Sequence, residues 1–308
     1  MTAITAPDEL KHALSSGMLS FPLTDFDANG EFNPDGFARR LQWLGGYNAG
    51  ALFAAGGAGE FFSLTGPEYA AVIHQAVTVT AGARPVIAAT GYGTRMAIAL
   101  AREAQEQGAD GLLLLPPYLT EASQQGLRDH VIAVCQATRL GVIVYNRANM
   151  RIRAETLAQI AQACPNLIGF KDGVGDLEEL LKIKALLGDQ LLCINGMPTA
   201  EIYASAYCGM GVPVYSSAIF NFVPRSAVDF HKAVVAGDQV RVRQFTRDFL
   251  APYGALRARQ PGYAVSIVKA GAAIVGRSAG KVRPPLSEVT LDERAELERL
   301  IARLGPQD

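Results

Sequence analysis

The sequence has 308 residues, of which 49% are hydrophobic and 19% charged, and its formal net charge at pH 7 is −1. This length is sufficient to bury a large core, and α/β barrels of this size often form one domain. Because the charge is nearly balanced, nothing points to nucleic acid or to an anionic membrane as a partner. Any affinity for an anionic substrate must come from local donors.

The N-terminus and the cysteines predict a cytoplasmic protein. Residues 1–10 lack the basic-then-apolar pattern of a signal peptide, and no apolar run is long enough to span a bilayer. Cys135, Cys164, Cys193 and Cys208 form no C-x-x-C pair and lie in apolar settings. We therefore expect buried free thiols in a reducing compartment rather than disulfides or zinc ligands.

Short apolar runs alternate with helical patterns along most of the chain. Strands are expected at residues 18–24, 51–55, 85–90, 111–115, 141–145, 167–171, 191–194 and 211–215. Helices are expected at residues 34–47, 67–81, 94–107, 123–138, 154–164, 177–187, 198–208 and 224–236. The strands are continuous apolar runs, which is typical of strands buried on both faces. Eight such repeats predict an α/β fold, a (β/α)8 TIM barrel, with a doubly wound open sheet as the competing architecture.

Three further helical patterns follow, at residues 240–256, 263–275 and 291–304. Their apolar positions recur at helical spacing, so these helices are expected to pack on the side of the barrel or to form subunit contacts. The expected organisation is a barrel over residues 1–236 and a C-terminal helical extension, packed on the barrel, over residues 237–308.

Lys171 ends the sixth apolar strand, and function in a parallel barrel gathers at the carboxyl ends of the strands. Burial there disfavours the charged amine and lowers its pKa. A neutral lysine is a nucleophile towards ketones and forms a Schiff base with them. The alternative is a lysine that extends its charge past the strand end into water.

Tyr145 ends the fifth strand, next to the strand of Lys171. Neighbouring strands lie about 4.8 Å apart, so the phenol can reach the amine and carry protons for it. A tyrosine that only anchors the strand end through its hydroxyl is the alternative.

Polar and glycine-rich segments follow the other strands. The turn Gly56-Gly57-Ala58-Gly59-Glu60 can direct several N–H groups at a carboxylate, although many such turns bind nothing. On the same rim, Asn195 and Gly196 follow the seventh strand, and Ser216 and Ser217 follow the eighth. The predicted substrate-binding set is Gly57, Ala58, Gly59, Asn195, Gly196 and Ser217.

No metal or nucleotide cofactor is indicated by the sequence. His12, His74, His130 and His231 are scattered over predicted helices, which does not favour a histidine metal site. Neither a G-x-x-x-x-G-K-[ST] loop nor a strand–G-x-G-x-x-G–helix unit with its acidic partner is present.

The chain resembles the dihydrodipicolinate synthase/N-acetylneuraminate lyase family of Schiff-base barrels over nearly its whole length. Three segments carry the resemblance, in order: Gly56-Gly57-Ala58-Gly59-Glu60, Val144-Tyr145-Asn146 and Gly169-Phe170-Lys171-Asp172. The resemblance implies that Lys171 forms the Schiff base, that Tyr145 carries the proton and that Gly57 and Ala58 hold the carboxylate of an α-keto acid. It also implies a homo-oligomer, commonly a tetramer.

Finer features resemble one branch of that family, which dehydrates and decarboxylates 5-dehydro-4-deoxy-D-glucarate to 2,5-dioxopentanoate. They lie at residues 54–64, 196–201, 214–221 and 262–271. Gly57 and Ala58 stand where the synthases carry two threonines, Leu119 where they carry a second tyrosine, and Met150 near their semialdehyde-binding arginine. These differences from the synthases favour neither their inter-subunit proton relay nor their condensation reaction.

Two other functions are compatible with the sequence. A retro-aldol lyase would cleave a 2-keto-3-deoxy sugar acid to pyruvate from the same iminium, with a base on the β-hydroxyl that the sequence does not place. A non-catalytic barrel that binds a keto acid would need neither Lys171 nor Tyr145. The donors for the far carboxylate of a keto diacid also remain open, among Asn195, Ser216, Ser217 and Arg147.

Overall fold

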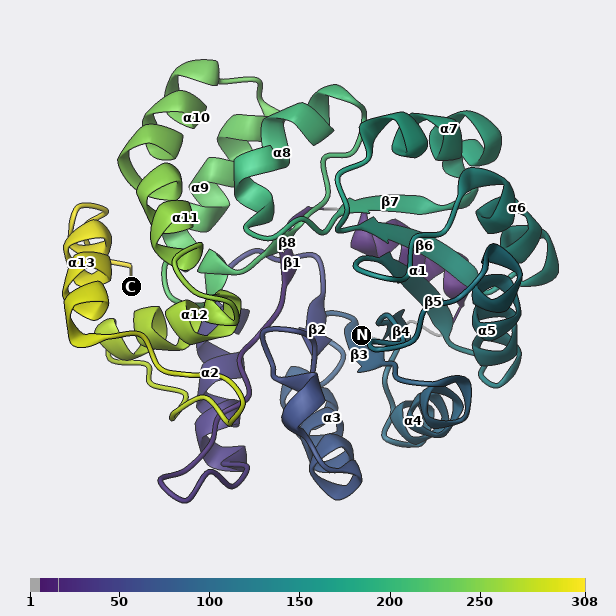
Figure 1. Ribbon diagram of the computed structural model, residues 1–308. Helices are drawn as coiled ribbons and strands as arrows, with labels where there is room; N and C mark the ends of the chain where they lie inside the picture. Colours follow the sequence, from purple (N-terminus) through teal and green to yellow (C-terminus); the bar gives the residue numbers. More distant parts are fainter. Residues whose placement is uncertain (1–5, 16, 308) are drawn as a thin grey trace.

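The computed structural model describes residues 6–15 and 17–307 (Figure 1). Residues 1–5, on which part of the signal-peptide prediction depends, lie outside the described residues. So do residue 16 and residue 308, the last residue of the expected C-terminal extension.

Eight parallel strands form a single sheet in the order β7-β6-β5-β4-β3-β2-β1-β8. A parallel bridge between Asn195 and Tyr215 joins β7 to the residue before β8, which brings the two ends of the sheet together. The predicted (β/α)8 barrel is confirmed, and the open sheet is wrong. The strands are β1 (Leu19–Ser20), β2 (Leu52–Ala54), β3 (Val86–Thr90), β4 (Gly111–Leu114), β5 (Gly141–Asn146), β6 (Leu167–Asp172), β7 (Leu192–Asn195) and β8 (Ser216–Ser217).

Helices surround the strands on the outside of the barrel (Figure 1). Several begin at a side chain that caps the free N–H groups of the first turn: Asn33 before α2, Ser123 before α5 and Asp176 before α7. The helices of the eight repeats are α2 (Pro34–Gly45), α3 (Gly66–Thr80), α4 (Thr94–Glu106), α5 (Gln124–Gln136), α6 (Ala154–Ala163), α7 (Leu177–Leu187), α8 (Ala200–Gly209) and α9 (Pro224–Val235).

The C-terminal helices lie on one side of the barrel (Figure 1). They are α10 (Gln239–Phe245), α11 (Ala251–Arg257), α12 (Tyr263–Ile274) and α13 (Leu291–Ala302). Phe222, just after β8, contacts the ring of Tyr253 on α11 at a centroid distance of 6.0 Å. A Cβ on Gly271 of α12 would lie 2.8 Å from the ring of Phe222, so glycine allows this close approach. The C-terminal helices thus share an apolar core with the eighth repeat.

Three elements differ from the sequence-based expectations. The eighth strand is the short β8 instead of residues 211–215, because Pro213 has no N–H to donate to a neighbouring strand. Pro22 shortens the first strand to β1 in the same way. The helix expected over residues 240–256 contains a π-helical segment, η4 (Thr246–Leu250), just before Pro252. A proline in that position removes an N–H and favours such a local shift.

The sequence reading missed one helix, α1 (Pro7–Leu14), which closes the amino end of the barrel. Leu10 and Leu14 are its buried residues. A Cβ on Gly111, at the start of β4, would lie 2.5 Å from Cδ2 of Leu10, and one on Gly141, at the start of β5, 3.3 Å from the same atom. The two glycines therefore leave the space that Leu10 fills.

We predict that Leu10→Ala lowers the free energy of unfolding by about 2–5 kcal/mol, because it opens a cavity where side chains meet at the barrel floor. The urea midpoint of unfolding would measure the change. Leu291→Ala is the matched control, since Leu291 is 85% exposed and its loss should change stability by less than about 0.5 kcal/mol. Equal midpoints for Leu10→Ala and the unsubstituted protein would contradict the proposed packing.

Candidate active site

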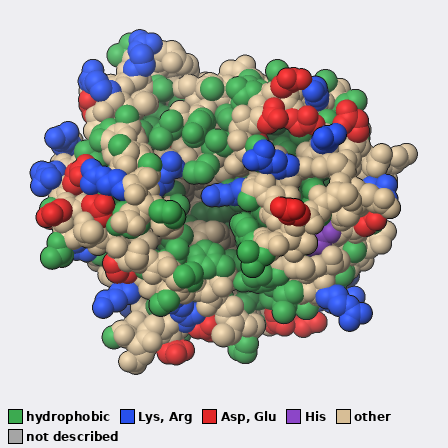
Figure 2. Space-filling model, in the orientation of Figure 1, with side chains coloured by type: hydrophobic (Ala, Val, Ile, Leu, Met, Phe, Trp, Pro, Cys, Tyr) green, Lys and Arg blue, Asp and Glu red, His purple; other side chains and the backbone are tan. Residues whose placement is uncertain are grey.

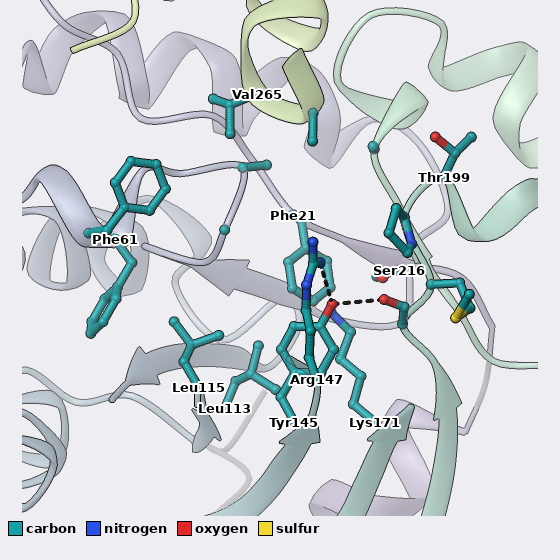
Figure 3. A pocket seen from close by; sticks show the side chains of 18 of the residues that line it. Phe21, Phe61, Leu113, Leu115, Tyr145, Arg147, Lys171, Thr199, Ser216 and Val265 are labelled. Carbon is teal, nitrogen blue, oxygen red and sulfur yellow. Dashed lines mark hydrogen bonds between the residues drawn. The ribbon is translucent and has the colours of Figure 1, made fainter. Parts of the chain in front are cut away.

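A cavity of about 320 Å³ opens at the carboxyl ends of the strands. Figure 2 shows the hollow on this face, and Figure 3 shows the side chains that line it. Lys171 and Tyr145 come from β6 and β5, while Arg257 and Val265 come from the C-terminal helices. The cavity therefore lies where parallel barrels place their active sites, and the C-terminal helices supply part of its wall.

The amine of Lys171 is enclosed by aromatic rings. The residue is 3% exposed, and its Nζ lies 4.2 Å from the ring centroid of Phe21 and 4.1 Å from that of Tyr145. Burial holds the pKa of Lys171 well below its ordinary value, and the charge of Arg147 lowers it further. The structure thus favours the neutral, nucleophilic amine, and the side chain does not extend into water.

Gly196 makes room for this arrangement. A Cβ at this position would come 2.6 Å from Cγ of Lys171 and 3.0 Å from Cε2 of Tyr145. Since both side chains are buried and packed, no larger residue fits without moving them. Gly196 was predicted to contact the substrate, and the structure places it in the cavity wall beside the side chain of Lys171.

Tyr145 lies directly opposite Lys171 in the register of β5 and β6. Its hydroxyl donates a hydrogen bond to the carbonyl oxygen of Gly196 at 2.8 Å and accepts one from Nη1 of Arg147 at 3.0 Å (Figure 3). Burial raises the pKa of Tyr145, and the nearby guanidinium opposes this rise. The phenol is therefore protonated at neutral pH, with a cation beside it that can stabilise the phenolate.

The glycine-rich turn reaches the cavity through Gly57 and Ala58. In the described part of the chain, neither residue donates its backbone N–H to another group. Gly59 does not line the cavity: its carbonyl accepts a hydrogen bond from Oγ1 of Thr24 at 2.6 Å, and a Cβ there would lie 3.2 Å from backbone atoms. The turn can thus offer two N–H groups to an anion, while Gly59 keeps the turn compact.

A buried ion pair fixes the end of this turn. Glu60 has a left-handed backbone with φ of 56°, and its carboxylate lies 2.6 Å from Nζ of Lys269 on α12. It also accepts the backbone N–H of Arg283 at 3.0 Å. The sequence reading missed both partners, because they lie far along the chain in segments without a recognisable motif. They tie the C-terminal segment to the turn that faces the cavity.

Asn195 and Ser217 support the wall more than they face the cavity. The side chain of Asn195 donates to the carbonyl oxygen of Ala200 at 2.9 Å and accepts the N–H of Met197 at 3.2 Å, so it fixes the loop after β7 and does not line the cavity. Ser217 lines it, but its hydroxyl donates to Glu201 at 2.6 Å. The prediction that Asn195 faces the substrate differs from the structure because its amide is used within the loop.

Among residues 6–15 and 17–307, no group of three His, Cys, Asp or Glu side chains is placed to hold a metal ion. None of the helices there combines the length and the apolar character needed to cross a membrane.

The fold and the enclosed lysine define a (β/α)8-barrel enzyme. The chain belongs to the dihydrodipicolinate synthetase family, whose model matches residues 14–304. A protein named 5-dehydro-4-deoxyglucarate dehydratase from Pseudomonas putida is 55% identical over 301 residues, which cover 98% of this chain and 99% of the relative. A probable 5-dehydro-4-deoxyglucarate dehydratase from Variovorax paradoxus is 56% identical with the same coverage.

Solved structures agree on the fold. The crystal structure of dihydrodipicolinate synthase from Oceanobacillus iheyensis superposes with a TM-score of 0.87 at 23% identity, covering 97% of this chain and 99% of that one. The synthase from Aquifex aeolicus gives 0.85 at 25% identity, over 94% and 98% of the two chains. The arrangement of strands and helices is thus shared with synthases whose sequences have diverged widely.

We predict that Arg147→Gln raises the pKa of Lys171. The guanidinium disfavours a second positive charge nearby, so its loss stabilises the protonated amine and moves the titration to higher pH. Labelling of Lys171 by acetic anhydride, followed by mass spectrometry over a series of pH values, would report the change. Arg151→Gln, an exposed arginine of the same loop, is the matched control. An unchanged titration in Arg147→Gln would mean that burial alone sets the pKa.

Proposed function

We propose that this protein is a lysine Schiff-base lyase that converts 5-dehydro-4-deoxy-D-glucarate into 2,5-dioxopentanoate, carbon dioxide and water. The substrate is inferred from the names of two relatives that are 55% and 56% identical to this chain. The observation that carries the chemistry is the buried amine of Lys171 in contact with the ring of Tyr145.

The first step joins the substrate to the protein. The neutral amine of Lys171 adds to the ketone, and the resulting carbinolamine loses water to give an iminium. The carboxylate next to the ketone binds the free N–H groups of Gly57 and Ala58. The hydroxyl of Tyr145 supplies the proton for the departing water and becomes a phenolate that Arg147 stabilises.

The second step removes the β-hydroxyl. The iminium draws electrons and makes the adjacent methylene acidic, so the phenolate of Tyr145, or a water that it holds, takes one of its protons. The enamine formed then expels the β-hydroxyl as water, after a proton is returned to it. The product is an unsaturated iminium conjugated towards the carbon that bears the far carboxylate.

The third step releases carbon dioxide. The bond to the far carboxylate breaks, and its electrons flow along the conjugated chain to the nitrogen of Lys171. Protonation and hydrolysis then free the amine and release 2,5-dioxopentanoate. The lysine itself is the electron sink throughout, so the proposed reaction uses no metal and no nucleotide.

Retro-aldol cleavage starts from the same iminium but needs a base on the β-hydroxyl. None of the cavity-lining residues in the described chain is Asp, Glu or His, so the phenolate of Tyr145 would have to act as that base, and the names of the relatives favour dehydration. Product analysis separates the two reactions: carbon dioxide with a five-carbon dioxo acid, or pyruvate with an aldehyde.

We predict that Lys171→Met abolishes turnover and all covalent trapping of pyruvate by borohydride, because methionine fills the space between the two rings without an amine. Mass spectrometry of the reduced adduct in the unsubstituted protein should place the label on Lys171. Lys182→Met, an exposed lysine of α7, should behave like the unsubstituted protein. If no residue were labelled although the keto acid binds, the barrel would be a non-catalytic keto-acid binder instead.

Tyr145→Phe should slow turnover by about 10²–10⁴-fold, since the ring still contacts Lys171 but no proton carrier remains. The rate of carbon dioxide release would measure this, with Tyr47→Phe as the control, since the Tyr47 hydroxyl donates to the carbonyl oxygen of Gln307 away from the cavity. A near-normal rate in Tyr145→Phe would remove the phenol from the mechanism.

We further propose that the protein is a cytoplasmic homo-oligomer. Its resemblance to the family implies a tetramer. Exposed apolar side chains on the outer helices support self-association: Leu177 and Leu181 on α7, and Ile202 and Tyr203 on α8. Sedimentation equilibrium would test this, and a mass equal to one chain at micromolar concentration would refute it.

A further inference from the structure

Two guanidinium groups line the cavity, and neither is paired with a carboxylate in the described part of the chain. Arg147 donates to the hydroxyl of Tyr145 at 3.0 Å, and Arg257 donates to Oγ1 of Thr199 at 2.7 Å. No Asp or Glu is among the lining residues of that part. With Lys171 neutral, the cavity carries two positive charges, which suits a substrate with two carboxylates.

The two arginines lie in different parts of the site. Arg147 is next to the reacting groups, since it contacts Tyr145 and its charge acts on Lys171. Arg257 is the last residue of α11 and contacts Thr199, on the wall formed by the loop after β7. In a keto diacid, one carboxylate is bonded to the carbon that Lys171 attacks, and the other is several bonds away. Of the two arginines, only Arg257 lies apart from the reacting groups.

The contact between Arg257 and Thr199 fixes the guanidinium at this wall. Thr199 has a left-handed backbone with φ of 52°, which is uncommon and strained for a β-branched residue. Its hydroxyl holds Nη1 of Arg257, while Nε and Nη2 have no hydrogen-bond partner among the described residues. Strain of this kind is retained mainly at functional sites, and the guanidinium keeps donors available for a carboxylate.

The surrounding wall adds to the positive potential. Gly262 lines the cavity and precedes α12, a helix of 12 residues whose amino end carries partial positive charge. Ser216 also lines the cavity and can add a hydroxyl donor (Figure 3). The cavity wall thus combines a charged group with neutral donors.

We propose that Arg257 binds the far carboxylate of the substrate and makes the site select keto diacids over keto monoacids. The inference rests on the proposed function, because attachment of the keto carbon to Lys171 defines which carboxylate is far. It assigns the far carboxylate to a residue of the C-terminal helices instead of the barrel rim.

The test compares two keto acids that differ only at the far end: 2-oxoadipate, and 2-oxohexanoate, which has a methyl group in place of the second carboxylate. Each is trapped on Lys171 with cyanoborohydride, and mass spectrometry gives the concentration at half-maximal labelling. The unsubstituted protein should favour 2-oxoadipate. Arg257→Met should weaken its trapping by about 10–100-fold, the usual effect of one charged hydrogen-bonding group, and should leave 2-oxohexanoate within about twofold.

Two further variants make the result specific. Arg257→Lys keeps the charge but loses the forked donor, so its loss for 2-oxoadipate should be intermediate, and it serves if Arg257→Met does not fold. Arg259→Met removes an arginine just beyond α11 that pairs with Glu296 at 2.8 Å, and it should change neither acid.

Several outcomes would overturn the inference. They are equal losses for both acids, no loss for 2-oxoadipate, or an unsubstituted protein that does not distinguish the acids. In each of these cases trapping still occurs, so the Schiff-base function survives. If neither acid is trapped on Lys171 in the unsubstituted protein, the proposed function fails, and the inference fails with it.

Discussion

The chemistry of this protein depends on keeping one lysine amine away from water. Removing an ammonium ion from water without a partner is costly, and the group responds by losing its proton. Phe21 and Tyr145 supply the apolar contact, and Gly196 leaves the space in which the side chain lies. The hydrogen bond from Arg147 to Tyr145 then places a cation where it disfavours a second charge. The proposed reaction needs each of these contacts at the start.

A second buried lysine in the same molecule shows what difference a partner makes. Lys269 is as buried as Lys171, and burial lowers its pKa too, but the charge of Glu60 opposes this effect. Its amine also donates to the carbonyl oxygen of Lys281 at 2.9 Å. Lys269 is therefore held as a structural cation that supports the glycine-rich turn, whereas Lys171 has no carboxylate partner among the described residues. The same side chain serves opposite purposes because its neighbours differ.

The parts of the structure that follow from local pattern could be predicted, and those that depend on distant contacts could not. Buried strands appear as apolar runs, so their order and the opposition of Tyr145 and Lys171 follow from the sequence. The helix α1 was not predicted because only two residues, Leu10 and Leu14, form its buried face. Nothing local to Lys269 or Arg257 shows that the chain returns to the cavity at these positions. Asn195 was predicted to bind the substrate, but a polar residue after a strand can equally fix its own loop, as the side chain of Asn195 does.

The C-terminal helices contribute Arg257 to the wall of the cavity, while the lysine and the tyrosine belong to the barrel. If Arg257 binds the far carboxylate as proposed, bond making and substrate choice are encoded in separate stretches of the chain. Replacement of residues on α11 and at the start of α12 would redirect the site to other keto acids without disturbing the nucleophile. Divergence within the family, and laboratory redesign, can therefore proceed through the tail of the chain while the catalytic strands stay unchanged.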